Sequence, residues 1–207
     1  MSSSIPSIDR CLLLMDEFAM LDNIREHSIM VAQVAGILLS GMETMGDTQP
    51  PRDLVIAGAL LHDIAKTQCI KERCDHSKLG NAICVELGYP EIGEIVQEHV
   101  ILADFPVERY RKGIFLAKEI VHYADKRVLH DQVVSLDTRL DYIIERYGDN
   151  DASRHTLIRK NFRRCQDLED FLFAHIRYTP EDLPLLVPGF PLLTDLKTEG
   201  TLTSRSF

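Results

Sequence analysis

The residues with the clearest capacity for chemistry are histidines and aspartates. His62 and Asp63 directly follow the apolar run 54–61. A helix that is apolar on every side is expected to be buried, and an ionised carboxylate beside it is costly unless it is paired. A metal ion is one such partner. The dipeptide alone proves little, because the chain also contains His130-Asp131, which lies in a polar stretch and which we interpret as surface residues.

Four further side chains can complete a metal site. His27 lies in a segment with mostly apolar neighbours, and Asp125 lies late in another apolar segment. His76 and His99 lie between them in the sequence. Imidazole and carboxylate ligands together suit iron, manganese or other borderline divalent ions. Helical bundles build such sites from side chains on facing helices, so we expect these residues to meet at one centre.

The segments that must position these side chains are predicted to be helices, because no run shows the alternation of a half-buried strand. Ser7 can cap a helix that continues to about Leu21, and Pro51 can open a third helix. The other helices are expected at about residues 24–42, 76–87, 90–100, 113–129, 135–147 and 152–177. The predicted fold class is therefore an all-α helical bundle.

Four parts of the chain are distinguished. An N-terminal helix within residues 1–22 precedes the metal-binding domain, residues 23–148, and a C-terminal helix, residues 149–178, is expected to pack on its core. The tail, residues 179–207, is rich in proline and is predicted not to be helical. Its many apolar residues predict an irregular strap against the core or against a second subunit, as in a homodimer.

Composition narrows the function classes. The chain of 207 residues is 45% hydrophobic and 27% charged, which is typical of a globular protein, and its formal net charge is -9. That charge argues against a nucleic-acid partner. We expect a solvated surface at the basic face of the last helix, with an RNA or protein contact as the alternative; this face comprises Arg159, Lys160, Arg163 and Arg164.

No targeting or membrane-spanning segment is evident, so a cytoplasmic protein with no membrane partner is expected. Five cysteines then suggest reduced thiols. A zinc site is the weaker alternative, since the spacing of the candidate ligands fits no common finger; these are Cys69, Cys74, His76 and Cys84.

The order His, His-Asp, Asp on helices resembles the HD superfamily of metal-dependent phosphohydrolases. The motif His62-Asp-Ile-Ala-Lys66 resembles the superfamily's His-Asp-Ile-Gly-Lys form, with Ala65 in place of glycine. Two further histidines, matched here by His76 and His99, mark the branch that holds two metals. The arrangement is similar to bacterial di-iron hydrolases of diadenosine tetraphosphate, although the stretch between Asp63 and His76 is shorter than expected for them.

This resemblance implies a site and a mechanism. One divalent ion would be held by His27, His62, Asp63 and Asp125, and a second by Asp63, His76 and His99. Iron or manganese is expected, with cobalt, nickel or magnesium as alternatives. A hydroxide between the ions, oriented in part by Asp63, would attack phosphorus in a small phosphorylated molecule, such as a nucleotide. Lys66 would bind a phosphate oxygen, with Lys126 and Arg127 as weaker candidates.

Two other functions remain open. In a mononuclear HD 5'-nucleotidase, His76 and His99 would serve only the substrate pocket. In a non-catalytic module, the fold would sense nucleotides or act as a scaffold. Individual histidines also have structural interpretations: His27 can be a hydrogen-bonded core residue, His122 can support the site or simply pack, and His155 and His175 are expected at the surface.

Overall fold

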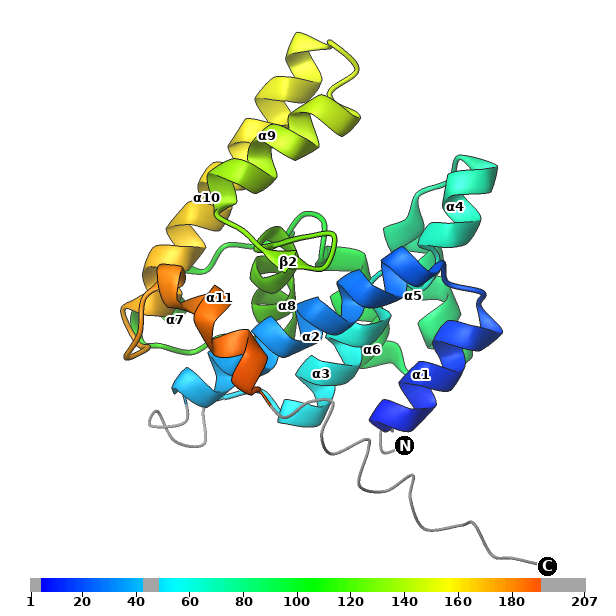
Figure 1. Ribbon diagram of the computed structural model, residues 1–207, viewed down its shortest axis with the longest axis horizontal. Coiled ribbons are helices and arrows are strands. Elements are labelled where there is room, and N and C mark those ends of the chain that lie inside the picture. Colours follow the sequence, from blue (N-terminus) through cyan, green and yellow to red (C-terminus); the bar gives the residue numbers. More distant parts are fainter. Residues whose placement is uncertain (1–4, 43–48, 191–207) are drawn as a thin grey trace, which may run out of the picture.

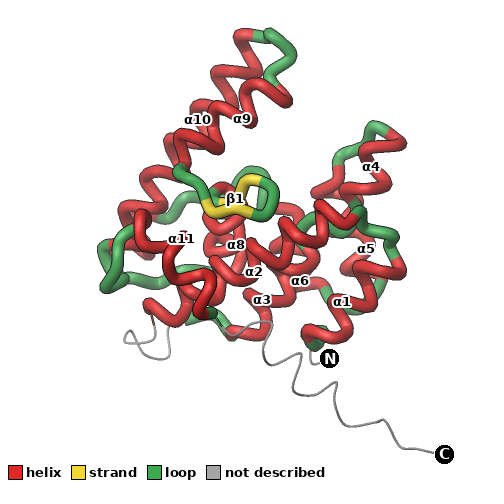
Figure 2. Tube along the Cα trace, in the orientation of Figure 1, coloured by secondary structure: helices red, strands yellow, loops and turns green. Residues whose placement is uncertain are grey.

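The computed structural model describes residues 5–42 and 49–190. Helices make up nearly all of the regular structure in these two ranges, which confirms the all-α fold class (Figures 1 and 2). The longer helices are α1 (Ile8–Glu17), α2 (Asp22–Met42), α3 (Arg52–Leu61), α5 (His76–Glu86), α6 (Pro90–Glu98), α8 (Ala117–Lys126), α9 (Leu136–Tyr147) and α10 (Ala152–Phe173). The shorter ones are α4 (Lys66–Glu72), α7 (Val107–Arg111) and α11 (Leu183–Leu186).

Helices α2 and α3 form the centre of the bundle. Helix α2 packs on α3 and α8, and α3 also contacts α1 and α6. Every residue of α3 from Val55 to Leu61 is buried, as expected for a helix that is apolar on all sides. Because α3 is enclosed, the turn that follows it places His62 and Asp63 inside the protein.

Local signals fix the beginnings of several helices. The Ser7 hydroxyl accepts a hydrogen bond from the Arg10 amide at the start of α1. Helix α1 ends at Glu17, earlier than predicted, because Ala19 adopts a left-handed conformation with a φ of 48°. The carboxylate of Asp75 accepts bonds from the amides of Ser77 and Lys78, which fixes the start of α5 at His76.

The predicted helix 113–129 is wrong at both ends. Helix α8 begins only after Leu116, whose amide donates to the buried Glu119 carboxylate at 2.7 Å. It ends at Lys126, and the chain then forms the antiparallel strands β1 (Val128–Leu129) and β2 (Gln132–Val133), which the sequence did not predict. Strands of two residues are too short to show an alternating pattern.

Helices α9 and α10 form an antiparallel pair that extends away from the bundle (Figure 1). Only the C-terminal part of α10 packs on the core, through Phe162, Cys165, Leu168 and Leu172. This helix ends at Phe173 rather than near residue 177.

The prediction that the tail from Thr179 lacks helix is wrong for the residues described. Short 3-10 turns at Pro180–Asp182 and Val187–Gly189 flank α11. Pro184 is tolerated because it lies in the first turn of α11, where an amide has no helical partner. Leu183 is buried and α11 contacts α2, so this part of the tail packs against the core. The rest of the predicted strap, residues 191–207, lies outside the described residues.

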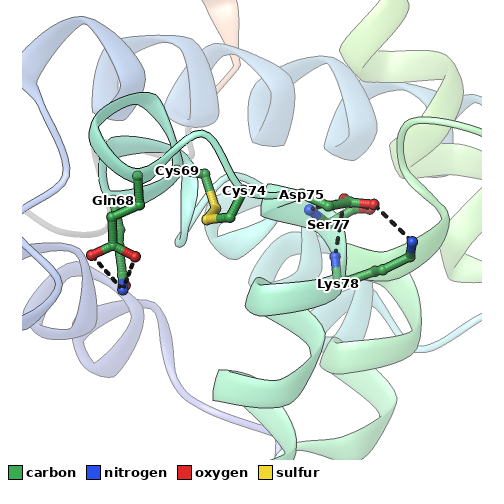
Figure 3. Close-up of a disulfide and its surroundings, with 7 residues drawn as sticks. Gln68, Cys69, Cys74, Asp75, Ser77 and Lys78 are labelled. Carbon is green, nitrogen blue, oxygen red and sulfur yellow. Dashed lines mark hydrogen bonds and ion pairs between the residues drawn. A yellow bond between two sulfur atoms is a disulfide. The ribbon is translucent and has the colours of Figure 1, made fainter.

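Two of the five cysteines form a disulfide, which corrects the expectation of reduced thiols. Cys69 in α4 is bonded to Cys74, which lies just before Asp75 (Figure 3). Arg73 adopts a left-handed conformation with a φ of 56°, and this turn brings the two Cα atoms to 4.6 Å. Oxidised sulfurs cannot ligate zinc, so the zinc alternative is excluded in this state. The three free cysteines are all buried: Cys11, Cys84 and Cys165.

None of the helices in the described ranges has the length and apolar character needed to cross a membrane.

The disulfide predicts a thiol count. Protein unfolded without reductant should react with a thiol reagent at three cysteines, and at five after reduction. Cys74→Ser should expose one additional thiol without reductant, because Cys69 loses its partner. Five reactive thiols in the unreduced parent protein would contradict the disulfide.

Candidate metal centre

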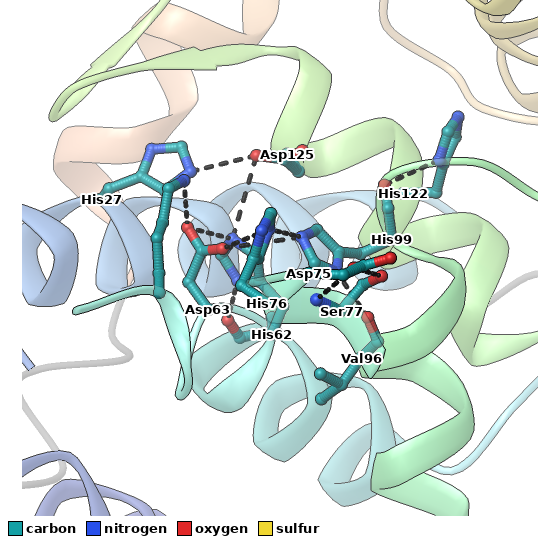
Figure 4. Close-up of polar contacts among 12 residues, drawn as sticks. His27, His62, Asp63, Asp75, His76, Ser77, Val96, His99, His122 and Asp125 are labelled. Carbon is teal, nitrogen blue, oxygen red and sulfur yellow. Dashed lines mark hydrogen bonds and ion pairs between the residues drawn. The ribbon is translucent and has the colours of Figure 1, made fainter. Parts of the chain in front are cut away.

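Six side chains that the sequence analysis singled out converge on one point (Figure 4). They come from five parts of the fold. His27 lies in α2, His62 and Asp63 lie in the turn after α3, His76 is the first residue of α5, His99 follows α6, and Asp125 lies near the end of α8.

The carboxylate of Asp63 is the hub of this cluster, and its side chain is fully buried. Oδ1 lies 3.3 Å from His76 Nε2 and 3.5 Å from His99 Nε2. Oδ2 lies 3.4 Å from His62 Nε2 and 2.6 Å from Lys66 Nζ. The two oxygens thus face two different sets of nitrogen atoms.

The cluster contains two groups with the spacing of metal ligands, and both include Asp63. His27 and His62 form one group with it, and His76 and His99 form the other; within each group the ligand atoms lie within 4.8 Å of one another. Asp125 adjoins the first group, with Oδ1 3.0 Å from His27 Nε2 and 3.8 Å from His62 Nε2. Five of the six predicted ligands therefore belong to these two groups, and Asp125 lies beside the first group.

The backbone sets the orientation of three imidazoles, each of which can donate from Nδ1 to a carbonyl oxygen. The pairs are His62 with Ala59 at 2.7 Å, His99 with Val96 at 2.6 Å, and His27 with His130 at 3.0 Å. A proton on Nδ1 leaves the lone pair on Nε2, which is the atom that faces the centre in each case. Such outer hydrogen bonds are the usual support of metal-binding histidines.

Two buried polar atoms at the centre have no hydrogen-bond partner among the described residues. They are His62 Nε2 and Asp63 Oδ1. A buried acceptor left unpaired costs about 1 to 3 kcal/mol, and more when it is charged. A cation bound between these atoms would satisfy both, so the donor set fits a divalent metal ion.

The charges of the carboxylates also suit a metal site. Burial tends to raise the pKa of Asp63, but Lys66 and His62 outweigh burial and hold that pKa well below its usual value. Lys126 and His27 likewise overcome the burial of Asp125 and keep its pKa well below normal. Both groups are therefore ionised at neutral pH, which is the state that binds metal.

Three of the histidines are favoured in the neutral form that a metal requires. Burial lowers the pKa of His99 to about 4 and also lowers the pKa of His27 and of His76. His62 differs, because the Asp63 carboxylate outweighs burial and raises the pKa of His62. A cation at the centre would take over the role of that proton on His62.

The candidate phosphate-binding residues differ in placement. Lys66 Nζ is bound to Asp63, and its side chain remains 26% exposed. Lys126 is buried and supports two ligand residues, because its ammonium donates to Asp125 Oδ2 at 2.7 Å and to the His99 carbonyl at 3.0 Å. The interpretation of Arg127 is corrected, because its guanidinium is buried and binds Glu169, Tyr123 and the carbonyls of Val134 and Pro180.

The remaining histidines lie outside the cluster of candidate ligands. His122 is buried, and its Nδ1 lies 2.8 Å from the His99 carbonyl, so it supports the backbone beside the site. His130 and Asp131 have exposed side chains, as expected for the second His-Asp pair. His155 and His175 are half-buried rather than at the surface, and His175 Nε2 lies 3.2 Å from the Tyr110 carbonyl.

Two contributors were missed by the sequence analysis. The His130 carbonyl orients His27, which no side-chain pattern could reveal. Arg139 in α9 is buried, with Nη2 3.6 Å from Asp125 Oδ1. Its signal was a basic residue three positions after Leu136, on the face of α9 that turns toward the bundle.

Acid should destabilise the metal-free protein through His122. Burial lowers the pKa of His122 to about 3, whereas an unfolded histidine has a pKa of about 6.5. The unfolded chain therefore binds an extra proton between these values, and the free energy of unfolding falls by up to about 1.4 kcal/mol per pH unit as the pH decreases. In His122→Gln, urea titrations in chelator should show a shallower dependence on pH. An unchanged slope would contradict the buried neutral imidazole.

Comparisons with known proteins agree with this geometry. A family model described as HD domain matches residues 24–128. A tRNA (cytidine(56)-2'-O)-methyltransferase of Picrophilus torridus is 30% identical over 147 residues, which are 66% of this chain and 40% of that protein. The chain thus spans about two fifths of this relative. No solved structure gives a significant match. Because the family model covers half of the chain and all six clustered residues, this chain belongs to the HD superfamily of metal-dependent phosphohydrolases.

Proposed function

We propose that this protein is a metal-dependent hydrolase that cleaves a phosphoester or phosphoanhydride bond in a small molecule, with a nucleotide as the expected class. The observation that carries the proposal is the arrangement of four imidazoles and Asp125 around the buried Asp63, with two ligand atoms that have no hydrogen-bond partner among the described residues. An apolar core would not tolerate this cluster without a partner.

Two divalent ions are the proposed cofactors. His27, His62, Asp63 and Asp125 would hold one, and Asp63, His76 and His99 the other. Mixed nitrogen and oxygen ligands favour iron or manganese, with cobalt, nickel and magnesium as alternatives.

The chemistry follows from this division of roles. Bound divalent ions would lower the pKa of water and neutralise the charge of a phosphate group. Asp63 lies between both ligand groups and would fix their separation, and it can help to orient the attacking water. The Lys66 ammonium, beside Asp63, can move to a phosphate oxygen when a substrate enters.

Exposure indicates how a substrate would arrive. The side chains of His76 and Lys66 are 28% and 26% exposed, whereas the other clustered side chains are at most 9% exposed. Access is therefore from the side of α4 and α5. Because the other clustered side chains are buried, a small substrate is the expected class. The relative from Picrophilus torridus is named for an activity on tRNA, but the net charge of -9 argues against a nucleic-acid surface on this chain.

The first test pairs elemental analysis with phosphate release. Protein purified without chelator should contain about two equivalents of metal and should release phosphate from members of a nucleotide panel. Asp63→Asn should reduce metal content and lower activity by more than about 100-fold, because even changes to outer-shell groups cost about 10- to 100-fold. Asp131→Asn is the matched control, since it alters the exposed second His-Asp pair and should leave both unchanged.

His99→Ala separates the dinuclear proposal from its alternatives. If the parent protein binds two equivalents of metal and His99→Ala binds about one, the dinuclear site with a shared Asp63 is supported. If the parent protein binds one equivalent and His99→Ala retains it, the mononuclear nucleotidase is indicated. Tight nucleotide binding by the metal-loaded parent without turnover across the panel would contradict the hydrolase and indicate a sensing or scaffold module.

A further inference from the structure

Arg139 is a buried cation with unused hydrogen-bonding capacity next to the metal centre. Its side chain is 8% exposed, and Nη2 lies 3.6 Å from Asp125 Oδ1. We propose that the Arg139 guanidinium binds a phosphoryl oxygen of the substrate beside Asp125. This rests on the proposed function, because it assigns a residue to the recognition of that substrate.

Within residues 5–42 and 49–190, the Arg139 side chain has an ion pair with Asp125 but no hydrogen bond. The distance of 3.6 Å exceeds that of a hydrogen bond. Nε is buried and has no hydrogen-bond partner in the described part of the chain. Leaving charged donors unpaired in the interior is costly, so this group is expected to have a ligand other than the residues that the structure describes.

Neighbouring cations show that this state is unusual. Arg127 uses three nitrogen atoms in hydrogen bonds, and Lys126 donates to both Asp125 and a carbonyl. Asp125 is already held by Lys126 on Oδ2, and its Oδ1 faces His27 Nε2 at 3.0 Å, where a proposed metal ion would bind both. Positioning Asp125 therefore does not account for Arg139.

The fold holds Arg139 in place. Ser135 caps α9 by accepting from the Thr138 amide, and Arg139 follows in the first turn of the helix. The Tyr142 ring, one turn later, has its centroid 5.5 Å from the Arg139 Cζ atom. That ring also packs edge-on against His130, the residue whose carbonyl orients His27. The same elements that support the metal ligand thus set the direction of Arg139.

The chemistry of this donor set selects an anion with several oxygens. Nε and Nη2 lie on one edge of the planar guanidinium and form a fork that matches two oxygens of a phosphate. Nη2 on this edge is the atom close to Asp125. A phosphoryl group bound there would lie against a proposed metal ligand, where a reacting phosphate must be. Lys66, whose Nζ lies 2.6 Å from Asp63 Oδ2, would contact a different oxygen.

The direct test observes the Arg139 Nε–H group by side-chain NMR in protein loaded with diamagnetic magnesium or zinc. Inorganic phosphate should shift the Arg139 Nε–H resonance in a saturable way. The Arg127 Nε–H resonance is an internal control, because that group already donates to the Val134 carbonyl at 2.7 Å. A phosphate titration that leaves the Arg139 resonance in place would overturn the proposal.

Variants provide a second test. Arg139→Met should weaken phosphate binding, measured by calorimetry, by about 10-fold or more, while metal content stays the same. Arg139→Lys keeps the charge, protects against loss of folding, and should bind phosphate with intermediate affinity. Arg146→Met, which alters an exposed arginine of the same helix, should bind phosphate like the parent.

The outcomes separate this proposal from the proposed function. A phosphate affinity within twofold of that of the parent protein in both Arg139 variants would overturn the phosphate contact. Loss of metal from Arg139→Lys would also overturn it, because Arg139 would then be a positioning residue for Asp125. If the protein binds phosphate through Arg139 but hydrolyses nothing, the hydrolase proposal fails and the contact stands.

Discussion

The burial of the Asp63 carboxylate is the constraint on which the rest of the structure depends. A charge with no exposure to water needs compensation from several directions. Here it comes from an ammonium group and three imidazoles, and one oxygen still has no hydrogen-bond partner among the residues that the structure describes. A divalent cation would bind this oxygen and compensate the buried negative charge of Asp63. The cluster is therefore understood best as a binding site rather than as a structural network.

The fold can be described as a means of bringing five other candidate ligands to this carboxylate. The all-apolar helix α3 can only be buried, and it carries His62 and Asp63 inward with it. Helices α2 and α8, which pack on α3, contribute His27 and Asp125, and His99 follows α6. Backbone carbonyls then rotate the imidazoles so that Nε2 faces the centre. The centre thus depends on how helices end as much as on which side chains they carry.

Sequence reasoning succeeded where a pattern and its physical cause coincide. The apolar surroundings of His62-Asp63 distinguished that pair from the exposed His130-Asp131, and helix periodicity located most of the bundle. It failed where the outcome depends on a single backbone conformation. The left-handed Arg73 permits the Cys69–Cys74 disulfide, and the tight turn at His130 permits two strands. Arg139 was missed because residue type alone does not separate a buried arginine from an exposed one such as Arg146 in the same helix.

Anomalous diffraction from crystals of the protein loaded with manganese tests the central claim most directly. The account predicts anomalous density on both sides of Asp63, one peak among His27, His62 and Asp125 and the other beside His76 and His99. A single peak at the first position would retain the metal centre with one ion. Density elsewhere, with the cluster empty, would contradict the account.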